Sequence, residues 1–230
     1  VTVTAKDPSG ASIATTFALA VTNPVPVAVN DVATTAYLTP VTAKVGVNDT
    51  DADGDALSFS KTSDPKNGTA TVAADGTYVY TPKTGFSGTD SFTYQVKDAD
   101  GATATATVTI TVQNAGPLVT AIAAQNGVDF TAFTLNAGSS FSDPNGDKLT
   151  FSATGLPKGL SIDPVTGIIS GTLDKSASVG GPYSVTVTAK DPSGASIATT
   201  FKLGVTNPAP VAVNDVFVVV SGEILTGDVG

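Results

Sequence analysis

The chain has 230 residues and a formal net charge of −9, and all 11 of its basic residues are lysine. Cysteine, histidine, methionine and tryptophan are absent, which excludes disulfides, thiolate chemistry, imidazole zinc sites and histidine-based triads. Without a basic stripe to neutralise phosphates we expect no nucleic-acid binding, and without an apolar run of roughly 18 residues we expect no membrane insertion in this segment.

Threonine, valine, alanine, glycine and serine dominate the composition. β-Branched residues favour pleated strands, and clusters of Gly, Pro, Asn and Asp recur every few residues. Long helical periodicity is absent. The sequence therefore predicts an all-β fold.

Internal repeats divide the chain. Residues 1–32 reappear at 185–216, an offset of 184, with 29 of 32 positions identical because only positions 18, 20 and 25 differ. A fainter repeat aligns 51–60 with 143–152, an offset of 92. Two module types of about 92 residues therefore alternate along the chain.

These repeats predict four pieces: 1–22 as the last strands of a truncated module, 23–113 and 114–207 as complete modules of two types, and 208–230 as the start of the next module. The chain begins in mid-pattern, so we expect it to be a window from a longer array. Proline-containing joints separate the pieces, and proline limits flexibility and removes a ladder donor. The joints lie at 23–26 (NPVP), 114–117 (NAGP) and 207–210 (NPAP).

Alternating or β-branched runs mark the strands. In the first complete module they lie at 41–47, 56–61, 68–72, 77–81, 90–97 and 103–112. In the second they are clearest at 148–153, 168–172, 181–190 and 197–205. About seven short strands in some 92 residues are typical of immunoglobulin-like or cadherin-like sandwiches, here in a linear tandem array. Core positions are expected for Phe59, Tyr78, Tyr80, Phe92, Tyr94, Phe151 and Tyr183.

Carboxylates cluster in the first complete module. Asp49, Asp51, Asp53 and Asp55 fall within seven residues, and Gly54 allows a sharp bend. The run resembles the start of an EF-hand loop, but the twelfth position is serine and a strand follows instead of a helix. Calcium needs 6–8 oxygen ligands, which short Asp-rich loops can supply. The run therefore predicts a calcium-binding loop between strands.

Sandwich topology predicts that this loop meets a second acidic loop at 98–101, because the B–C and F–G loops share one end of such a fold. The chain enters at the same end, and the second module repeats the plan. We interpret Asp64, Asp75, Asp90, Asp163 and Asp174 instead as turn or surface residues. The candidate Ca2+ ligands are Asn30, Asp31, Asp49, Asp51, Asp53, Asp55, Asp98, Asp100, Asn114, Asp143, Asn145, Asp147 and Asp191.

Residues 27–112 resemble the bacterial cadherin-like modules of giant secreted adhesins. The resemblance rests on 27–31 (VAVND), 47–55 (VNDTDADGD), 80–82 (YTP), 85–94 (GFSGTDSFTY) and 97–101 (KDADG). Residues 118–207 resemble the dystroglycan-type cadherin-like immunoglobulin module. That second resemblance rests on 141–149 (FSDPNGDKL), 155–163 (GLPKGLSID) and 166–172 (TGIISGT).

The leading interpretation is a calcium-rigidified stalk segment of a bacterial cell-surface adhesin or extracellular filament, located at the surface or secreted. Its partners would be the neighbouring modules of the same chain. Two alternatives stay open, a polysaccharide-binding accessory module of a secreted enzyme and a homotypic fibre subunit. Exposed end-loop carboxylates, with no arginine, histidine or tryptophan to handle a substrate, argue against an enzyme.

Overall fold

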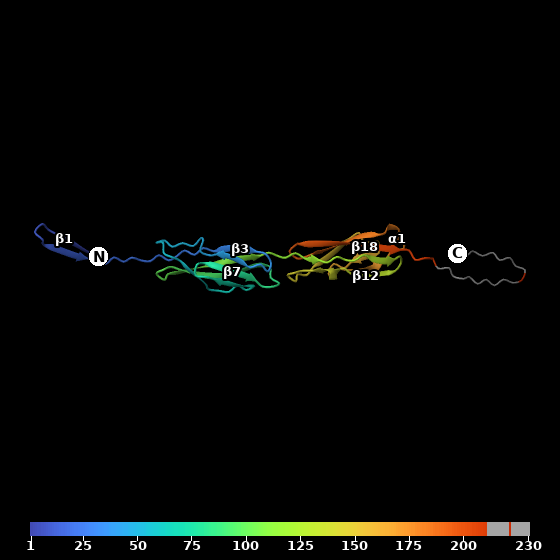
Figure 1. Cartoon of the computed structure of the whole chain (residues 1–230), viewed down its shortest axis with the longest axis horizontal. Coiled ribbons are helices and arrows are strands. Elements are labelled where there is room, and N and C mark those ends of the chain that lie inside the picture. The colour runs from blue at the N-terminus through green and yellow to red at the C-terminus, as the bar shows by residue number, and fades with distance from the viewer. Residues whose placement is uncertain (211–220, 222–230) are drawn as a thin grey trace. The chain divides into compact units, whose positions relative to one another are not determined.

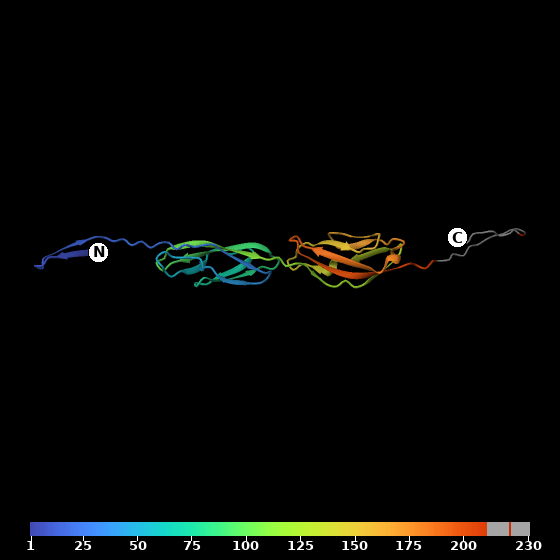
Figure 2. The same cartoon turned by 90° about the horizontal axis from the view of Figure 1, so that it is seen from above.

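The computed structural model describes residues 1–210 and residue 221. Strands dominate this part of the chain, which divides into two compact units (Figures 1 and 2). The first unit comprises residues 1–115 with 144–146, and the second begins at residue 116 and lacks 144–146. Each unit contains one β-sandwich, described here in turn.

The first sandwich is built from seven strands in two sheets. Its four-stranded sheet has the order β3-β9-β8-β5, and its three-stranded sheet has the order β4-β7-β6. β3 pairs with β9 in parallel, whereas the other pairs are antiparallel. The strands are β3 (Asp31–Thr35), β4 (Val41–Lys44), β5 (Ser58–Lys61), β6 (Gly68–Val72), β7 (Thr77–Pro82), β8 (Gly88–Lys97) and β9 (Thr103–Val112).

Period-two alternation forms the core of this sandwich. In β8, Phe92, Tyr94 and Val96 point inward and are at most 1% exposed, because successive side chains of a strand face opposite sides. They meet Tyr78 and Tyr80 from the facing sheet. The rings of Tyr78 and Phe92 pack edge to face with centroids 5.5 Å apart, which adds about 1 kcal/mol to the gain from burial.

The second sandwich has a four-stranded sheet in the order β11-β18-β17-β14, a three-stranded sheet in the order β12-β16-β15, and a small pair, β10-β13. Again one pair at the sheet edge, β11 with β18, is parallel. The strands are β10 (Leu118–Val119), β11 (Gln125–Val128), β12 (Ala132–Asn136), β13 (Phe141–Ser142), β14 (Thr150–Thr154), β15 (Leu160–Ile162), β16 (Ile168–Thr172), β17 (Tyr183–Lys190) and β18 (Ser196–Thr206). A 3-10 turn, η1 (Gly138–Ser140), and a one-turn helix, α1 (Ala177–Gly180), connect strands.

The most deeply buried side chains of the second sandwich are aliphatic, whereas those of the first include four aromatic rings. Val185 and Val187 of β17, Leu203 of β18 and Ile169 of β16 are all fully buried. Each such side chain contributes roughly 1.5–3 kcal/mol by leaving water. The two cores contain separate sets of residues, so each sandwich has its own hydrophobic centre.

A further hairpin comes first in the chain. Strand β1 (Thr2–Lys6) pairs antiparallel with β2 (Ser12–Thr16), and every residue of both strands is exposed. By sequence this hairpin is the counterpart of β17 and β18.

The sequence-based strands are confirmed at all ten predicted positions, and the predicted aromatic positions lie in or against the two cores. One interpretation was wrong. Asp90 is neither a turn nor a surface residue but a 4% exposed residue within β8. The expected module start at 208–230 lies almost wholly outside the described residues.

Candidate metal centres at the acidic loops

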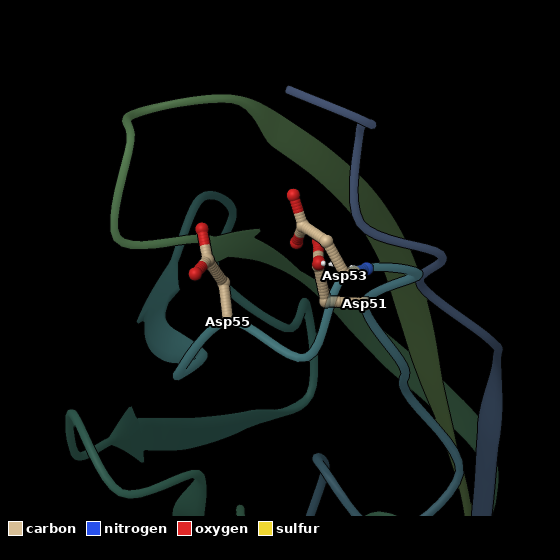
Figure 3. A group of neighbouring side chains, drawn as sticks. All are labelled: Asp51, Asp53 and Asp55. Atoms are coloured by element: carbon tan, nitrogen blue, oxygen red, sulfur yellow. Dashed lines mark hydrogen bonds between the residues drawn. The ribbon is translucent and has the colours of Figure 1, made fainter. Parts of the chain in front are cut away.

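The loop between β4 and β5 gathers three carboxylates in the first sandwich. Asp51, Asp53 and Asp55 each offer an oxygen within 4.8 Å of the others, and their side chains rise from one side of the loop (Figure 3). The backbone N–H of Asp53 donates to Asp51 Oδ1 at 3.1 Å. Gly54 then turns the chain with φ +87°, a left-handed conformation that glycine adopts without steric cost.

Asp98, from the turn between β8 and β9, lies near enough for its charge to act on Asp55. It is 4% exposed, and its Oδ1 accepts the backbone N–H groups of Gly101 and Ala102 at 2.6 and 2.8 Å. Its Oδ2 accepts the side-chain Nδ2 of Asn23 at 2.8 Å. One carboxylate oxygen therefore fixes the turn, and the other connects it to the segment that precedes β3.

The charges of these loops repel one another. Burial raises the pKa of Asp55, and the negative charges of Asp100, Asp51 and Asp98 raise it further. A hydrogen bond with Asp51, with burial and neighbouring charge, raises the pKa of Asp53 to about 6. The same hydrogen bond lowers the pKa of Asp51. This pattern shows that the acidic loops converge, as the topology argument predicts.

Three oxygens of this group are buried and accept no hydrogen bond: Asn23 Oδ1, Asp51 Oδ2 and Asp55 Oδ2. A buried polar atom without a partner costs about 1–3 kcal/mol. Hard divalent cations are coordinated by carboxylate and amide oxygens of this kind. The residues present therefore fit a calcium ion, which would be held by Asp51, Asp53 and Asp55, with Asn23 Oδ1 as a further oxygen and with Asp98 and Asp100 adding charge.

The second sandwich also has a group of three carboxylates, which comes from the equivalent loops but uses a different set of positions. Asp143, Asp147 and Asp191 each offer an oxygen within 4.8 Å of the others. They correspond by sequence to Asp51, Asp55 and Asp98. Asp191 is 4% exposed, and its Oδ1 accepts the backbone N–H groups of Gly194 and Ala195 at 2.8 and 2.9 Å, the turn that Asp98 holds in the first sandwich.

The two centres differ in charge. The first contains five carboxylates, whereas asparagine and serine replace two of them in the second, at Asn145 and Ser193. Asn145 Oδ1 accepts the backbone N–H of Ala115 at 2.9 Å. Asn114 is half-buried and occupies the sequence position that Asn23 has before the first sandwich.

The structure places three candidate ligands in a different setting. Asn30 Oδ1 accepts the backbone N–H of Thr107 at 2.9 Å and so belongs to the sheet edge. Asp49 is 8% exposed and accepts the backbone N–H of Val29 at 2.7 Å and the hydroxyl of Tyr94 at 3.1 Å. Asp31 lies beside this pair, and burial raises its pKa. The contacts of Asn30 and Asp49 indicate a structural role for these two residues, whereas Asp31 Oδ2 is buried without a hydrogen-bond partner.

Sequence reasoning missed Asn23. It included Asn114 among the candidate ligands but omitted the equivalent asparagine of the first module. The repeat contained the signal, because Asn23, Asn114 and Asn207 each begin a proline-containing joint. Aligning the three joints would have found it.

Two family models match the chain. Residues 23–111 match the model described as "Bacterial Ig domain", and residues 116–206 match the model described as "Putative Ig domain". The chain is a tandem of two immunoglobulin-like modules, the first of them from the bacterial Ig family. The two matched stretches contain the two sandwiches, and each stretch contains one of the acidic centres. No curated protein sequence matches the tandem.

Several solved structures resemble the tandem. An endo-fucoidan hydrolase of glycoside hydrolase family 107 shares 24% identity over 91% of this chain and 34% of its own, with a TM-score of 0.36. Protocadherin gamma B7 extracellular domains 1–4 share 16% identity over 80% of this chain and 51% of their own, with a TM-score of 0.40. Drosophila N-cadherin domains 1–4 share 15% identity over 80% of this chain and 51% of their own, with a TM-score of 0.36. The chain thus spans about a third of the hydrolase and half of each cadherin fragment. At these TM-scores the likenesses carry no functional argument.

Among residues 1–210, the structure contains no helix with the length and apolar character that a membrane span requires.

Proposed function

We propose that this tandem is a calcium-stiffened stalk segment of a bacterial cell-surface adhesin or extracellular filament. The observation that carries the proposal is the duplicated acidic centre, which has equivalent residues in two sandwiches of otherwise different sequence. Modules of these families are typically extracellular structural or adhesive units, and repeated modules of similar length suit a spacer.

The proposed mechanism is electrostatic. Without a cation, the carboxylates of each centre repel one another, and the first centre has buried oxygens without hydrogen-bond partners. A bound calcium ion supplies positive charge that turns this repulsion into attraction. Asn23 would connect the segment before β3 to the first centre, and Asn114 would do the same for the second. The joint that precedes each sandwich would then lose freedom of movement.

Calcium titration by isothermal calorimetry tests the binding. The natural chain should show binding at both centres. Asp55→Asn should weaken binding at the first centre at least tenfold, and Asp147→Asn should do so at the second. Asp64→Asn is the matched control, because it removes one exposed negative charge outside both centres. Absence of calcium-dependent heat in the natural chain would disprove the proposal.

The polysaccharide-binding alternative requires exposed aromatic side chains grouped on a face or loop. Within the described residues, Tyr78, Tyr80, Phe92 and Tyr94 are instead at most 1% exposed and fill the first core. The exposed phenylalanines of this part of the chain, Phe17 and Phe130, belong to different units and so do not form a group within one of them. The stalk is therefore the better-supported proposal. A glycan-binding screen of the full chain distinguishes the two functions.

A further inference from the structure

The loop that contains Asp143 and Asp147 has a middle part that belongs to the first compact unit. Residues 144–146 are grouped with residues 1–115, whereas Asp143 and Asp147 on either side are not. Because peptide geometry fixes the distance between neighbouring residues, whatever holds 144–146 also restricts where the two carboxylates can lie. The contacts of this short segment therefore affect the second metal centre.

Tyr37 makes one of these contacts. Its hydroxyl donates to the Pro144 carbonyl oxygen at 2.6 Å and accepts the backbone N–H of Gly85 at 3.1 Å. A tyrosine hydroxyl can donate one hydrogen bond while it accepts another, so the two bonds are compatible. The hydroxyl thus connects the acidic loop to the turn between β7 and β8.

Two further contacts involve the same segment. Asn145 Oδ1 accepts the backbone N–H of Ala115 at 2.9 Å. Gly85 lies close enough to the Asn145 carbonyl oxygen that a Cβ added at Gly85 would be 3.4 Å from it. Of these contacts, the Tyr37 bond can be removed by a single side-chain change that leaves the backbone intact.

The turn that carries Tyr37 contains a strained residue. Leu38 has φ +54°, which is uncommon for a residue other than glycine. The Thr39 N–H donates to the Ala36 carbonyl oxygen at 3.1 Å, and the Thr35 hydroxyl donates to the Thr39 carbonyl oxygen at 2.6 Å. Backbone strain persists where the surrounding structure over-determines it. These contacts fix the backbone from which the Tyr37 side chain extends.

The second sandwich has a similar left-handed residue but a different neighbour beside it. At the offset of 92, Leu38 corresponds to Phe130, which has φ +62°. Tyr37 corresponds to Asp129, which is 1% exposed and accepts the N–H and the hydroxyl of Ser178 within its own sandwich. The tyrosine contact therefore distinguishes the first sandwich from the second.

We propose that Tyr37 is a positioning residue for the second metal centre. By holding the Pro144 carbonyl, its hydroxyl restricts the loop on which Asp143 and Asp147 lie. Preorganised ligands bind more tightly, because less conformational freedom is lost on binding. This inference rests on the proposed calcium function and adds to it a residue outside the acidic loops.

Coupling of this kind acts in both directions. If the Tyr37 bond favours calcium binding at the second centre, calcium binding favours the Tyr37 bond by the same factor. Calcium at that centre would thus hold residues 144–146 more firmly within the first compact unit.

Calcium titration by isothermal calorimetry tests this role in full-length chains that carry Asp55→Asn, so that the second centre is the tighter site. Tyr37→Phe keeps the ring and removes the hydroxyl, and it should weaken calcium binding roughly three- to tenfold. Tyr183→Phe is the matched control and should leave the affinity unchanged. The half-buried Tyr183 donates its hydroxyl to the Ala177 carbonyl oxygen at 2.8 Å, at the opposite end of β17 from Asp191.

The same two variants are then titrated with Asp147→Asn in place of Asp55→Asn, which leaves the first centre as the tighter site. A residue that only stabilised the first sandwich would weaken this centre as well, whereas Tyr37→Phe should leave it unchanged. Equal affinities of Tyr37→Phe and Tyr183→Phe at the second centre, or an equal loss at both centres, would overturn the inference and leave the proposed function intact. Absence of calcium binding in the Asp55→Asn chain would reject the proposed function at the second centre and this inference with it.

A measurement without calcium checks the contact itself. In excess chelator, the Gly85 amide should exchange with solvent faster in Tyr37→Phe than in the natural chain, because it loses its acceptor. Tyr183→Phe should leave this exchange unchanged. Equal exchange of Gly85 in all three chains, measured by NMR, would show that the Tyr37 contact does not form and would overturn the inference.

Discussion

At the residue scale, Asp31 and Asp49 surround the hydroxyl of Tyr94. Asp49 accepts that hydroxyl and the Val29 N–H, whereas Asp31 Oδ2 is buried without a hydrogen-bond partner. Burial raises the pKa of Asp31, the Tyr94 hydroxyl opposes this, and the charge of Asp49 raises the pKa further. Burial is also the largest cause of the raised pKa of Tyr94. The first core thus contains a carboxyl group whose charged form is disfavoured.

This environment predicts that Asp31→Asn stabilises the first sandwich at pH 7 in calcium-free buffer. A folded-state pKa above the unfolded value stabilises the protein at low pH, and that contribution disappears as the pH rises through the folded-state pKa. The gain in the free energy of unfolding should therefore be small below about pH 3.8 and grow above it. Urea unfolding across this pH range measures it.

Asp75→Asn provides the control of opposite sign. Hydrogen bonds from Thr77, followed by Lys44, lower the pKa of Asp75, so its contribution is present above the unfolded pKa and disappears as the pH falls. This variant should not stabilise the protein at pH 7. If both variants shift stability in the same direction, the interpretation of Asp31 is wrong.

Asp90 is a buried carboxylate whose two oxygens both accept hydrogen bonds. Its oxygens accept the backbone N–H groups of Lys66 and Asn67 at 3.0 and 2.8 Å and the hydroxyl of Tyr80 at 3.0 Å. Asp129 has the same kind of role in the second sandwich, where it accepts the N–H and the hydroxyl of Ser178. These aspartates connect a loop to the core.

Replacing Asp90 with alanine should destabilise the first sandwich by about 3 kcal/mol, because it leaves several buried donors unpaired. Asp64→Ala, at a side chain that is 79% exposed, should change stability by less than about 0.5 kcal/mol. Equilibrium urea unfolding of both variants measures the difference. Equal effects would show that the Asp90 contacts contribute little.

At the element scale, the strands β6 and β8 each begin with a glycine, and the two positions require glycine for different reasons. A Cβ at Gly68 would lie 2.4 Å from the Tyr80 ring and 2.7 Å from the Thr81 carbonyl oxygen. Gly88 has φ +110°, but a Cβ there would meet nothing within 4 Å. Close packing requires the first glycine, and backbone conformation requires the second.

Gly68→Ala should therefore cost more than Gly88→Ala. The first forces a core ring and a strand carbonyl to move, which costs roughly 3 kcal/mol, whereas the second adds only conformational strain of roughly 1–2 kcal/mol. Thermal unfolding of the two variants ranks them. The reverse order would mean that Tyr80 moves aside freely.

Sequence patterns predict the long, regularly alternating strands and miss short ones that tertiary pairing creates. The segment forming β11 contains Asn126-Gly127, an ordinary turn signal, yet it pairs in parallel with β18. A Cβ at Gly127 would lie 2.5 Å from Leu173 Cδ1, so a larger residue there would require the Leu173 side chain to shift. The predicted topology places Asn30-Asp31 next to the acidic loops, so the sequence suggests metal ligands at this position. In the structure Asp31 begins the strand β3, which the sequence patterns do not predict. Both strands depend on contacts distant in sequence, which local patterns do not encode.

The candidate centres are predictable for a different reason. The repeat at an offset of 92 aligns Asp51 and Asp55 with Asp143 and Asp147, and sandwich topology brings the 98–101 turn to the first loop. What sequence patterns cannot separate is Asp49 from Asp51, two carboxylates two residues apart. One faces the core and accepts hydrogen bonds, while the other offers an unpaired oxygen.

At the scale of the whole molecule, the proposed function predicts that calcium changes the dimensions of the chain. If the ion connects Asn23 and Asn114 to their centres, joint freedom should fall when calcium binds, and the average end-to-end distance should rise. Small-angle X-ray scattering in excess calcium and in excess chelator measures this, and the radius of gyration should be larger with calcium.

Asp98→Asn combined with Asp191→Asn should abolish the response, because asparagine retains Oδ1, which accepts the turn N–H groups, and removes the charge. Asp64→Asn with Asp163→Asn removes the same charge away from both centres and should respond like the natural chain. If calorimetry shows calcium binding but scattering shows no change, the metal centres are supported and the proposal that calcium stiffens the chain is wrong.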